Sequence, residues 1–289
     1  MSAILSDFKS KTLKTAGFIL YSYIFKLCAI VTFSFKSRYL NPNPNKIMKT
    51  THLLLSSLLL FFIGCTNAQW NKTIKGNGKA TTEIRAFDPY DIISVNGSMD
   101  VSLVEGSEGS ITLKAEENIL EYIEVTNNNG KLSIKTKDHV NLRPSWKKGV
   151  HIEIPVEEIT KISINGSGEV TGNLTLKAAK LKLSISGSGD MKVAADATAI
   201  KATISGSGDI DLSGKADELD ASVTGSGDID AKSLNANNVT AHVTGSGDIT
   251  AHAKNLLTVK IVGSGNVHVN RDVATINKKV VGSGKVSKY

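Results

Sequence analysis

The chain repeats the tripeptide Gly-Ser-Gly seven times, at intervals of 18 to 21 residues. The copies begin at positions 166, 187, 206, 225, 245, 263 and 282. A fixed period near twenty residues is typical of repeat architectures, in which each unit packs mainly on its two neighbours. This regularity constrains the possible folds more than any other feature, because every copy must fit the same structural role.

Apolar residues keep a constant register around each copy of the repeat. The positions two and four before the first glycine, and four after it, are apolar in nearly every copy, as in Leu183, Ile185 and Met191. These positions alternate along a strand, so their side chains point to the same side. Coils stacked about 4.8 Å apart would bury a core that no single coil can bury alone. We therefore predict an all-β fold, a single-stranded β-helix or β-solenoid with coils of about 19–21 residues.

The sequence divides the folded part into two halves of one domain. Residues 161–289 form the regular solenoid, and the lysines of its last repeat are interpreted as a C-terminal cap, with a binding patch as the alternative. Residues 76–160 alternate apolar and polar residues, which predicts N-terminal β coils with a hairpin excursion. The Asn-Asn-Asn-Gly segment at 127–130 predicts the hairpin turn. Gly76-Asn77-Gly78 and Asn96-Gly97 resemble degenerate early copies of the repeat.

The start of the chain has the features of a targeting segment. Residues 48–68 contain a short basic start and an apolar run of about eleven residues, which predicts a signal peptide rather than a membrane span of about 20 residues. Gly64-Cys65 is similar to the end of a lipoprotein signal, which predicts lipidation of Cys65. Phe62 departs from the usual leucine, so an ordinary signal peptide cleaved after Ala68 is the alternative.

Residues 1–47 are interpreted as an upstream extension from a mis-assigned start, with an additional membrane segment as the alternative. The net charge of +7 also originates near the start of the chain. Eight of the 34 basic residues and one of the 27 acidic residues precede Cys65, which leaves the remainder with no net charge. The net positive charge is therefore no argument that the folded part binds nucleic acid through a basic surface. The cysteines, Cys28 and Cys65, both lie in this leader, so the folded part has no internal disulfide.

Carboxylates recur three residues after the first glycine of the repeat. A stacked solenoid would align these side chains along one edge, where a stripe for a divalent cation or a cationic partner is one interpretation. The alternative is that each carboxylate accepts hydrogen bonds from backbone N–H groups of the turns. We predict no resident cofactor in either case. The column consists of Glu169, Asp190, Asp209, Asp228 and Asp248.

Residues 161–288 contain no Phe, Tyr or Trp. Aromatic side chains stack on sugar rings and on single-stranded bases, so their absence argues against both kinds of binding in the regular half. No nucleophile motif, metal spacing or nucleotide loop is present, and we predict no catalytic residues. Trp146 is the best candidate for a surface contact, with a ring that covers the end of the core as the alternative.

The motifs at Ser94–Val101 and Asn118–Ile123, followed by the Gly-Ser-Gly-Asp-Ile repeats, resemble the head GIN domain family of auto-transporter adhesins. The resemblance covers roughly residues 85–270. It implies a fold similar to pectin-lyase-like β-helices without their catalytic residues, and cell adhesion as the role. It supplies no site residues of its own.

These observations together predict a non-catalytic, exported protein of the bacterial cell envelope that serves adhesion or surface scaffolding. A carbohydrate-binding or carbohydrate-active β-helix is the alternative, and a structural envelope lipoprotein without an external ligand is a third. The expected partner is a surface protein or glycan, not nucleic acid. The protein is expected to associate with a membrane only by an N-terminal lipid anchor. The expected location is the outer membrane as a lipoprotein, the periplasm or the cell surface.

Overall fold

The structure is a computed structural model that describes residues 72–145 and 149–289. The chain divides into two units, residues 1–69 and 70–289, and every described residue belongs to the second unit. The predictions for residues 1–47, for the signal peptide with Cys65 and for Trp146 lie outside the described residues. No helix in the described ranges is both long and apolar enough to cross a bilayer.

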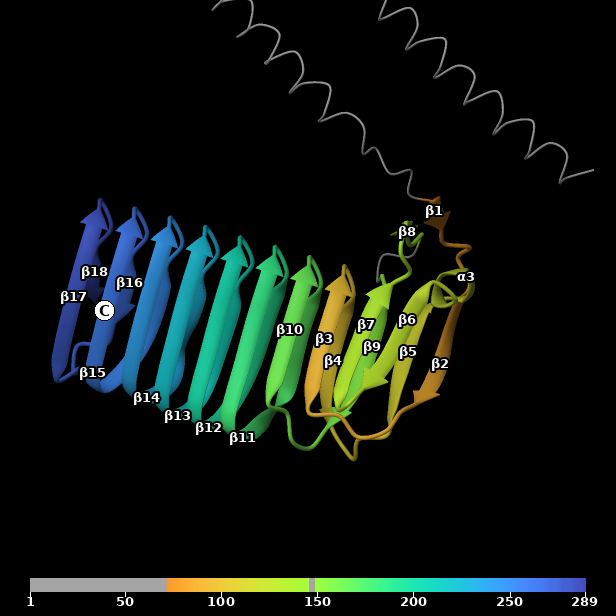
Figure 1. Cartoon of the computed structure of the whole chain (residues 1–289), viewed down its shortest axis with the longest axis horizontal. Helices are drawn as coiled ribbons and strands as arrows, with labels where there is room; N and C mark the ends of the chain where they lie inside the picture. Colours follow the sequence, from red (N-terminus) through yellow and green to blue (C-terminus); the bar gives the residue numbers. More distant parts are fainter. Residues whose placement is uncertain (1–71, 146–148) are drawn as a thin grey trace, which may run out of the picture. The chain divides into compact units, whose positions relative to one another are not determined.

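The regular half is a β-solenoid, as the period predicts (Figure 1). Successive coils pair in parallel and in exact repeat register, so that Ile164 lies beside Ile185, and Ile185 beside Ile204. The strands of this half are β10 (Lys161–Gly166), β11 (Glu169–Gly187), β12 (Asp190–Gly206), β13 (Ile210–Gly225), β14 (Ile229–Gly245), β15 (Ile249–Gly263), β16 (Val267–Val269), β17 (Thr275–Gly282) and β18 (Val286–Lys288).

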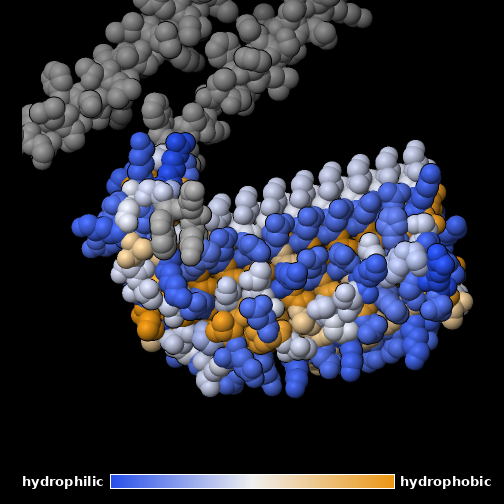
Figure 2. Space-filling model, turned by 180° about the vertical axis from the view of Figure 1, so that it is seen from behind, coloured by the Kyte–Doolittle hydropathy of each residue, from blue (hydrophilic) through white to orange (hydrophobic). Residues whose placement is uncertain are grey.

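The predicted apolar columns form the core. Ile164, Ile204 and Ile261, each two residues before a repeat, have no exposed surface, and the columns four before and four after it are buried in the same way up to the last coil. Outward-facing positions between them carry polar residues. Figure 2, which shows the molecule from behind, has hydrophobic residues in strips between hydrophilic rows along the regular coils. Burial of one continuous core across neighbouring coils is what stabilises a solenoid.

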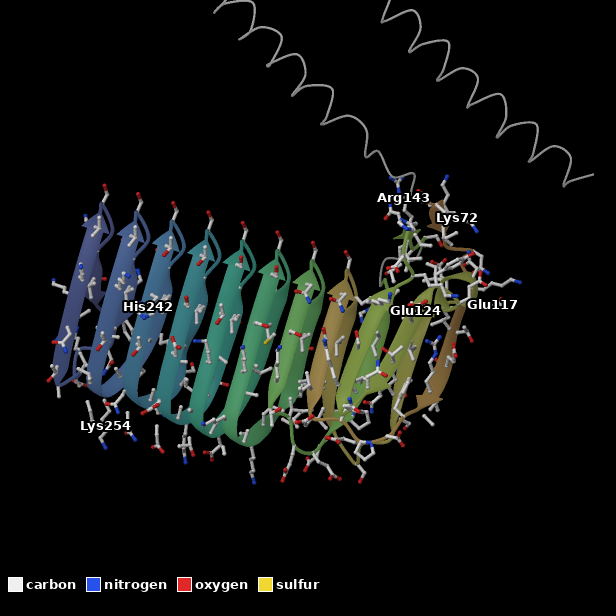
Figure 3. The ribbon with its side chains drawn as sticks, in the orientation of Figure 1. Lys72, Glu117, Glu124, Arg143, His242 and Lys254 are labelled. Atoms are coloured by element: carbon white, nitrogen blue, oxygen red, sulfur yellow. The ribbon has the colours of Figure 1, made fainter. Side chains whose placement is uncertain are left out.

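Both glycines of each repeat lie too close to the preceding coil for a side chain, and the first also has an unusual backbone conformation. The first glycine has a φ between +123° and +137° in all seven copies, a conformation that a side chain disfavours. The third residue of the tripeptide stacks on the preceding coil, where an added Cβ would lie 2.0 to 2.5 Å from a backbone oxygen. The serine between them is exposed in every copy. Figure 3 shows the resulting row of short, oxygen-ended side chains along the edge where the strand arrows end.

In the N-terminal half, the order of coils in space departs from the order in sequence. β3 (Ile92–Gly97) pairs with β10 on one side and with β7 (Lys131–Thr136) on the other. β4 (Asp100–Glu105) likewise pairs with β11 and with β9 (His151–Val156). The excursion after β4 therefore returns to add one more coil, made of β7 and β9, beyond the coil of β3 and β4. The prediction that Asn96-Gly97 is an early copy is confirmed, because Gly97 has a φ of +126° and pairs with Gly166.

Antiparallel strands close this end of the solenoid. β5 (Ser110–Glu116) runs antiparallel to β9 and to β2 (Ala80–Ala86), and β6 (Ile123–Asn128) runs antiparallel to β7. The predicted 127–130 turn joins β6 to β7, with positive φ at Asn129 and Gly130. The short helix α3 (Glu117–Leu120) connects β5 to β6.

The interpretation of Gly76-Asn77-Gly78 as a copy of the repeat was wrong. This segment joins β1 (Lys72–Lys75), which pairs with β8 (Val140–Arg143), to the antiparallel strand β2. A coil copy needs a parallel neighbour at the same register, and the end of the solenoid offers none. The glycines serve a local turn instead, where Gly78 has a φ of +77°.

The other end of the solenoid carries charge at its unpaired edge. Within the described chain, β17 pairs only with β15, and β18 only with β16. Lys278 lies opposite Val259, at a register position that is buried in the preceding coils. Val280 and Val281 are partly exposed beside it. Charge on an edge strand disfavours pairing with a further strand, which agrees with the predicted cap.

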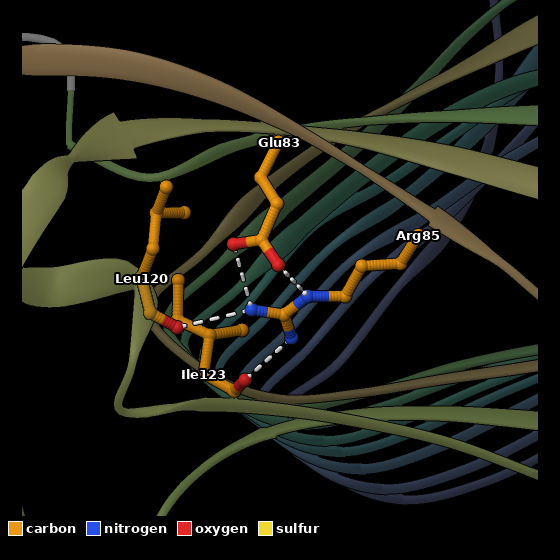
Figure 4. Close-up of polar contacts among 4 residues, drawn as sticks. All are labelled: Glu83, Arg85, Leu120 and Ile123. Carbon is orange, nitrogen blue, oxygen red and sulfur yellow. Dashed lines mark hydrogen bonds and ion pairs between the residues drawn. The ribbon is translucent and has the colours of Figure 1, made fainter.

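Hydrogen bonds from the Arg85 side chain connect β2 to the turn that follows α3 (Figure 4). Its guanidinium donates to both carboxylate oxygens of Glu83, at 2.9 and 3.1 Å, and to the carbonyl oxygens of Leu120 and Ile123, at 3.1 and 2.7 Å. Leu120 ends α3, so Arg85 satisfies a carbonyl group that the helix leaves without a partner. The hydrogen bond from Arg85 lowers the pKa of Glu83.

Replacing Arg85 with alanine is expected to destabilise the N-terminal end by about 1–3 kcal/mol, because two backbone acceptors lose a charged donor. Arg85→Lys should recover only part of this, since lysine lacks the planar fork. The lowered pKa of Glu83 means that the ion pair contributes above about pH 4.3 and is lost as the pH falls further. Urea unfolding at neutral and acidic pH measures both effects, and an unchanged difference between wild type and Arg85→Ala at acidic pH would contradict the role of Glu83.

Candidate functional site

The acidic column is a hydrogen-bonded ladder between coils. The Oδ1 atom of each aspartate accepts a hydrogen bond from the backbone N–H of the equivalent residue in the next coil. Asp209 N–H donates to Asp190 at 3.2 Å, Asp228 N–H to Asp209 at 2.9 Å, and Asp248 N–H to Asp228 at 2.7 Å. Asn266 continues the series, because its N–H donates to Asp248 at 2.6 Å. Glu169 starts the column, and its own N–H donates to the Met99 carbonyl.

This geometry matches the backbone-acceptor interpretation of the carboxylates. Each aspartate satisfies a backbone donor that would otherwise face solvent at the corner, and it links one coil to the next. Within residues 72–145 and 149–289, no three His, Cys, Asp or Glu side chains are grouped closely enough to hold a metal ion. The cation stripe therefore stays a prediction that the contacts do not favour.

Asp228 provides the test of the ladder. Asp228→Ala should destabilise the solenoid by about 1 kcal/mol, because the N–H of Asp248 loses its acceptor. Asp228→Asn should cost less, since its amide oxygen can accept the same bond and the repulsion between neighbouring carboxylates is removed. Thermal unfolding measures both variants. An equal loss in both, together with a melting temperature that rises with millimolar Ca²⁺ after EDTA treatment, would favour the cation stripe instead.

A groove of about 1180 Å³ lies at the junction of the two halves, and sequence reasoning did not find it. Because β4 and β9 are parallel neighbours, the loops that follow them, residues 106–109 and 157–160, come to the same edge. The groove adjoins β11, whose residues Asn173 and Leu174 complete the wall. Its acidic lining consists of Asp91, Glu105, Glu108, Glu157 and Glu158. Its apolar lining includes Leu103, Val104 and Leu174.

Glu108 and Tyr90 give this junction groove a fixed shape. Glu108 accepts hydrogen bonds from the backbone N–H of Tyr90, at 3.0 Å, and of Glu157, at 3.3 Å, so one carboxylate joins three chain segments. The buried Tyr90 hydroxyl donates to the Pro155 carbonyl oxygen at 2.6 Å. Burial, with the nearby charge of Glu108, raises the pKa of Tyr90 and keeps its hydroxyl protonated. Among the lining residues, Lys177 alone is cationic, so the junction groove is strongly acidic.

The junction groove combines an apolar contact with acidic side chains. Val104 is 38% exposed, which leaves an apolar contact beside the carboxylates. The carboxylate of Glu108 is engaged by backbone donors that hold the wall together. Asp91 accepts a hydrogen bond from the Thr160 hydroxyl. The other three acids, Glu105, Glu157 and Glu158, are exposed and could meet a cationic group.

Comparisons with known proteins agree with this description. Residues 89–272 match the family described as "Putative auto-transporter adhesin, head GIN domain". Among curated proteins none matches the chain.

Several solved structures share this fold. One, described as "a putative adhesin" from Bacteroides fragilis, has a TM-score of 0.67 at 22% identity, over 75% of this chain and 100% of that one. Another, described as a "Putative lipid binding protein" from Parabacteroides distasonis, has a TM-score of 0.64 at 24% identity, over 75% of this chain and 100% of that one. A third, described as "a putative adhesin" from Parabacteroides merdae, has a TM-score of 0.60 at 24% identity, over 75% of this chain and 99% of that one.

At these identities the solved structures show the shared fold, and the family is shown by the match itself. The family match covers residues 89–272, which is well over half of the chain. These residues include the coil of β3 and β4, the junction groove and the regular coils up to Asp272. The chain therefore belongs to the head GIN domain family of auto-transporter adhesins.

Proposed function

We propose that the protein is a non-catalytic, exported surface protein that binds a partner through its solenoid, in adhesion or as a surface scaffold. The observation that carries this proposal is the junction groove, whose walls are fixed by Glu108 and Tyr90 while Glu105, Glu157 and Glu158 face outward. A rigid groove with free charge on its rim suits binding to a preformed partner, because little ordering is needed on contact.

Membership of an adhesin family supports an exported location and a role without chemistry. The described residues agree with this, since the recurring acids are engaged in backbone hydrogen bonds rather than placed as an acid and base pair. A lipid on Cys65 would anchor the solenoid to the outer membrane, and Cys65→Ala should release the protein from the membrane fraction if this anchor is used.

The groove is tested by charge reversal in the full chain. Glu105→Lys, Glu157→Lys and Glu158→Lys together should abolish attachment of expressing cells to host surfaces or to other cells. The matched control reverses three exposed acids outside the groove, Glu117, Glu121 and Asp217, which gives the same change in net charge. Equal attachment by both variants, or failure of added protease to digest the protein on intact cells, would contradict the proposal.

The alternative, a carbohydrate-active β-helix, makes a different prediction. Such a protein would turn over a polysaccharide and would lose this activity on mutation of an acid in the junction groove. Release of reducing ends from any of a panel of polysaccharides, at a rate that depends on these acids, would replace the proposed function.

A further inference from the structure

The excursion after β4 leaves part of β11 without a neighbouring strand on one side. Residues 169–172 of β11 pair with β4, and residues 182–187 pair with β10. Within the described part of the chain, no strand pairs with residues 173–181 on that same side. In Figure 1, loops rather than strands lie on this side of the lower part of β11. We call residues 173–181 the open edge.

The next coil shows what the open edge lacks. Residues 194–197 of β12 pair with residues 175–178 of β11 on one side and with residues 213–216 of β13 on the other. β11 has no corresponding second neighbour, because the chain leaves the coil of β3 and β4 at Glu105 and β10 begins only at Lys161. The edge of a strand presents unpaired N–H and C=O groups, which form a template for a further strand.

The open edge forms one wall of the junction groove. The loops that follow β4 and β9 form the facing wall. The groove volume of about 1180 Å³ lies above the range of about 300–1,000 Å³ that is typical of small-molecule pockets. A recess between two walls admits a single extended chain more readily than the broad edge of a second solenoid. The residues of the open edge that line the groove are Asn173, Leu174, Thr175 and Lys177.

The charge of the groove favours a basic occupant. Its lining has five carboxylates and one ammonium group. Within the described residues, none of these five carboxylates forms an ion pair. An acidic segment would therefore be repelled and a basic one attracted. Apolar contacts are also present, since Val104 is exposed and Leu174 is only partly buried.

We infer that the junction groove binds an extended basic segment of a partner protein, which adds to the open edge as a further strand. Main-chain hydrogen bonds along the edge would supply affinity. Side chains of a strand alternate between two faces, so apolar ones can meet Val104 and Leu174 while cationic ones meet Glu105 and Glu158. This inference rests on the proposed function, because it names the chemistry of the partner that the same groove would bind.

The binding test uses the purified full chain and a fluorescent peptide of nine residues that alternates lysine and valine. Wild type should bind it, and more weakly at high salt because exposed charge pairs are screened. A peptide of the same composition, with its lysines and valines in separate blocks, should bind at least about fivefold more weakly. Glu105→Gln with Glu158→Gln should lower the affinity about fivefold. The matched control, Glu117→Gln with Glu121→Gln, changes two exposed acids outside the groove and should stay within about twofold of wild type.

Hydrogen exchange tests the strand addition itself and needs no variant. Without peptide, the amides of residues 175–178 should exchange faster on average than those of their register partners, residues 194–197, because alternate N–H groups of the open edge have no acceptor. The alternating peptide should slow exchange in residues 175–178 by at least about tenfold. Exchange in residues 194–197 should not change, since both sides of that stretch are already paired.

Four results would overturn the inference. These are no binding by wild type, equal binding of the block peptide, binding without slower exchange at the open edge, and a dimer of the purified chain in which the open edge is protected without peptide. Cell attachment tests the proposed function separately. If the alternating peptide does not bind while the triple glutamate-to-lysine variant still abolishes attachment, the inference alone fails. If the peptide binds while that variant attaches as well as its control, the proposed function alone fails.

Discussion

Replacing Gly208 with valine is expected to destabilise the solenoid by more than about 4 kcal/mol, a loss that exceeds the effect of most single substitutions. Gly208 lies directly on Gly189 of the preceding coil, and an added Cβ would be 2.0 Å from the carbonyl oxygen of that glycine. The oxygen belongs to the backbone, so it cannot move aside as a flexible side chain could. The two coils would have to separate, and the parallel pairing on both sides would be lost. Chemical denaturation followed by circular dichroism measures the effect.

Two further substitutions separate steric crowding from other causes. Ser207→Ala changes the adjacent, exposed side chain and should alter stability by no more than about 0.5 kcal/mol. Gly78→Ala tests backbone conformation alone, because Gly78 has a φ of +77° and open space around its Cβ position. It should cost about 1 kcal/mol. A Gly208→Val protein as stable as wild type would mean that the coils are not stacked as described.

Glu116→Ala is expected to open the N-terminal end, at a cost of about 3 kcal/mol. The Glu116 side chain is buried, and its carboxylate accepts hydrogen bonds from the backbone N–H of Gly78 at 2.5 Å and of Ser145 at 2.8 Å. The Ser145 hydroxyl donates to it as well. Removal of the carboxylate takes the acceptor away from all three donors and leaves a cavity at a buried position. Hydrogen exchange of the Gly78 and Ser145 amides, compared with amides of β13, measures the local opening.

Glu116→Gln is the matched control, because it keeps the size of the side chain and one acceptor oxygen. Its amide group would face the N–H of Ser145 as a second donor, so an intermediate loss is expected. Ser145→Ala removes one donor and leaves the carboxylate in place, and its effect should be the smallest of the three. If amide exchange in Glu116→Ala stayed slow at both positions, Glu116 would not be what holds the two segments together.

The regular half could be predicted almost completely from sequence, for a physical reason. In a solenoid each coil contacts only its neighbours, so the same local pattern decides burial, pairing and turn geometry in every copy. The register of Ile185, Ile204 and Val223 in the sequence is therefore their register in the structure. The glycine corners follow from the same argument, because one backbone conformation recurs at one place in each coil.

The N-terminal half could be predicted only in part. Alternation in β7 and β9 indicates strands, but nothing in it tells which strands they pair with. Their partners, β3 and β4, lie about 40 to 50 residues earlier in the chain. The segment Gly76-Asn77-Gly78 was misassigned because short glycine turns look alike whether the next strand runs parallel or antiparallel. Long-range pairing of this kind has no signature in local periodicity.

The same limit hid the junction groove. Glu105 and Glu157 are far apart in sequence, and only the pairing of β4 with β9 brings their loops together. The acidic column was found because it is unbroken over five repeats. Its hydrogen bonds depend on atomic geometry that the sequence does not contain.

The insertion of the β7 and β9 coil beyond that of β3 and β4 has a consequence for how the protein comes to be folded. A chain that crosses a membrane with its N-terminus first delivers β3 before either of its neighbours, β7 and β10. The coil of β3 and β4 is flanked on both sides only after residue 172 has emerged, whereas the antiparallel pairs of β2 with β5 and of β6 with β7 can form before then. From then on, each further stretch of about 19 residues can dock as it appears. Each docked coil would prevent the chain from sliding back across the membrane. Folding would therefore favour movement of the chain in the outward direction.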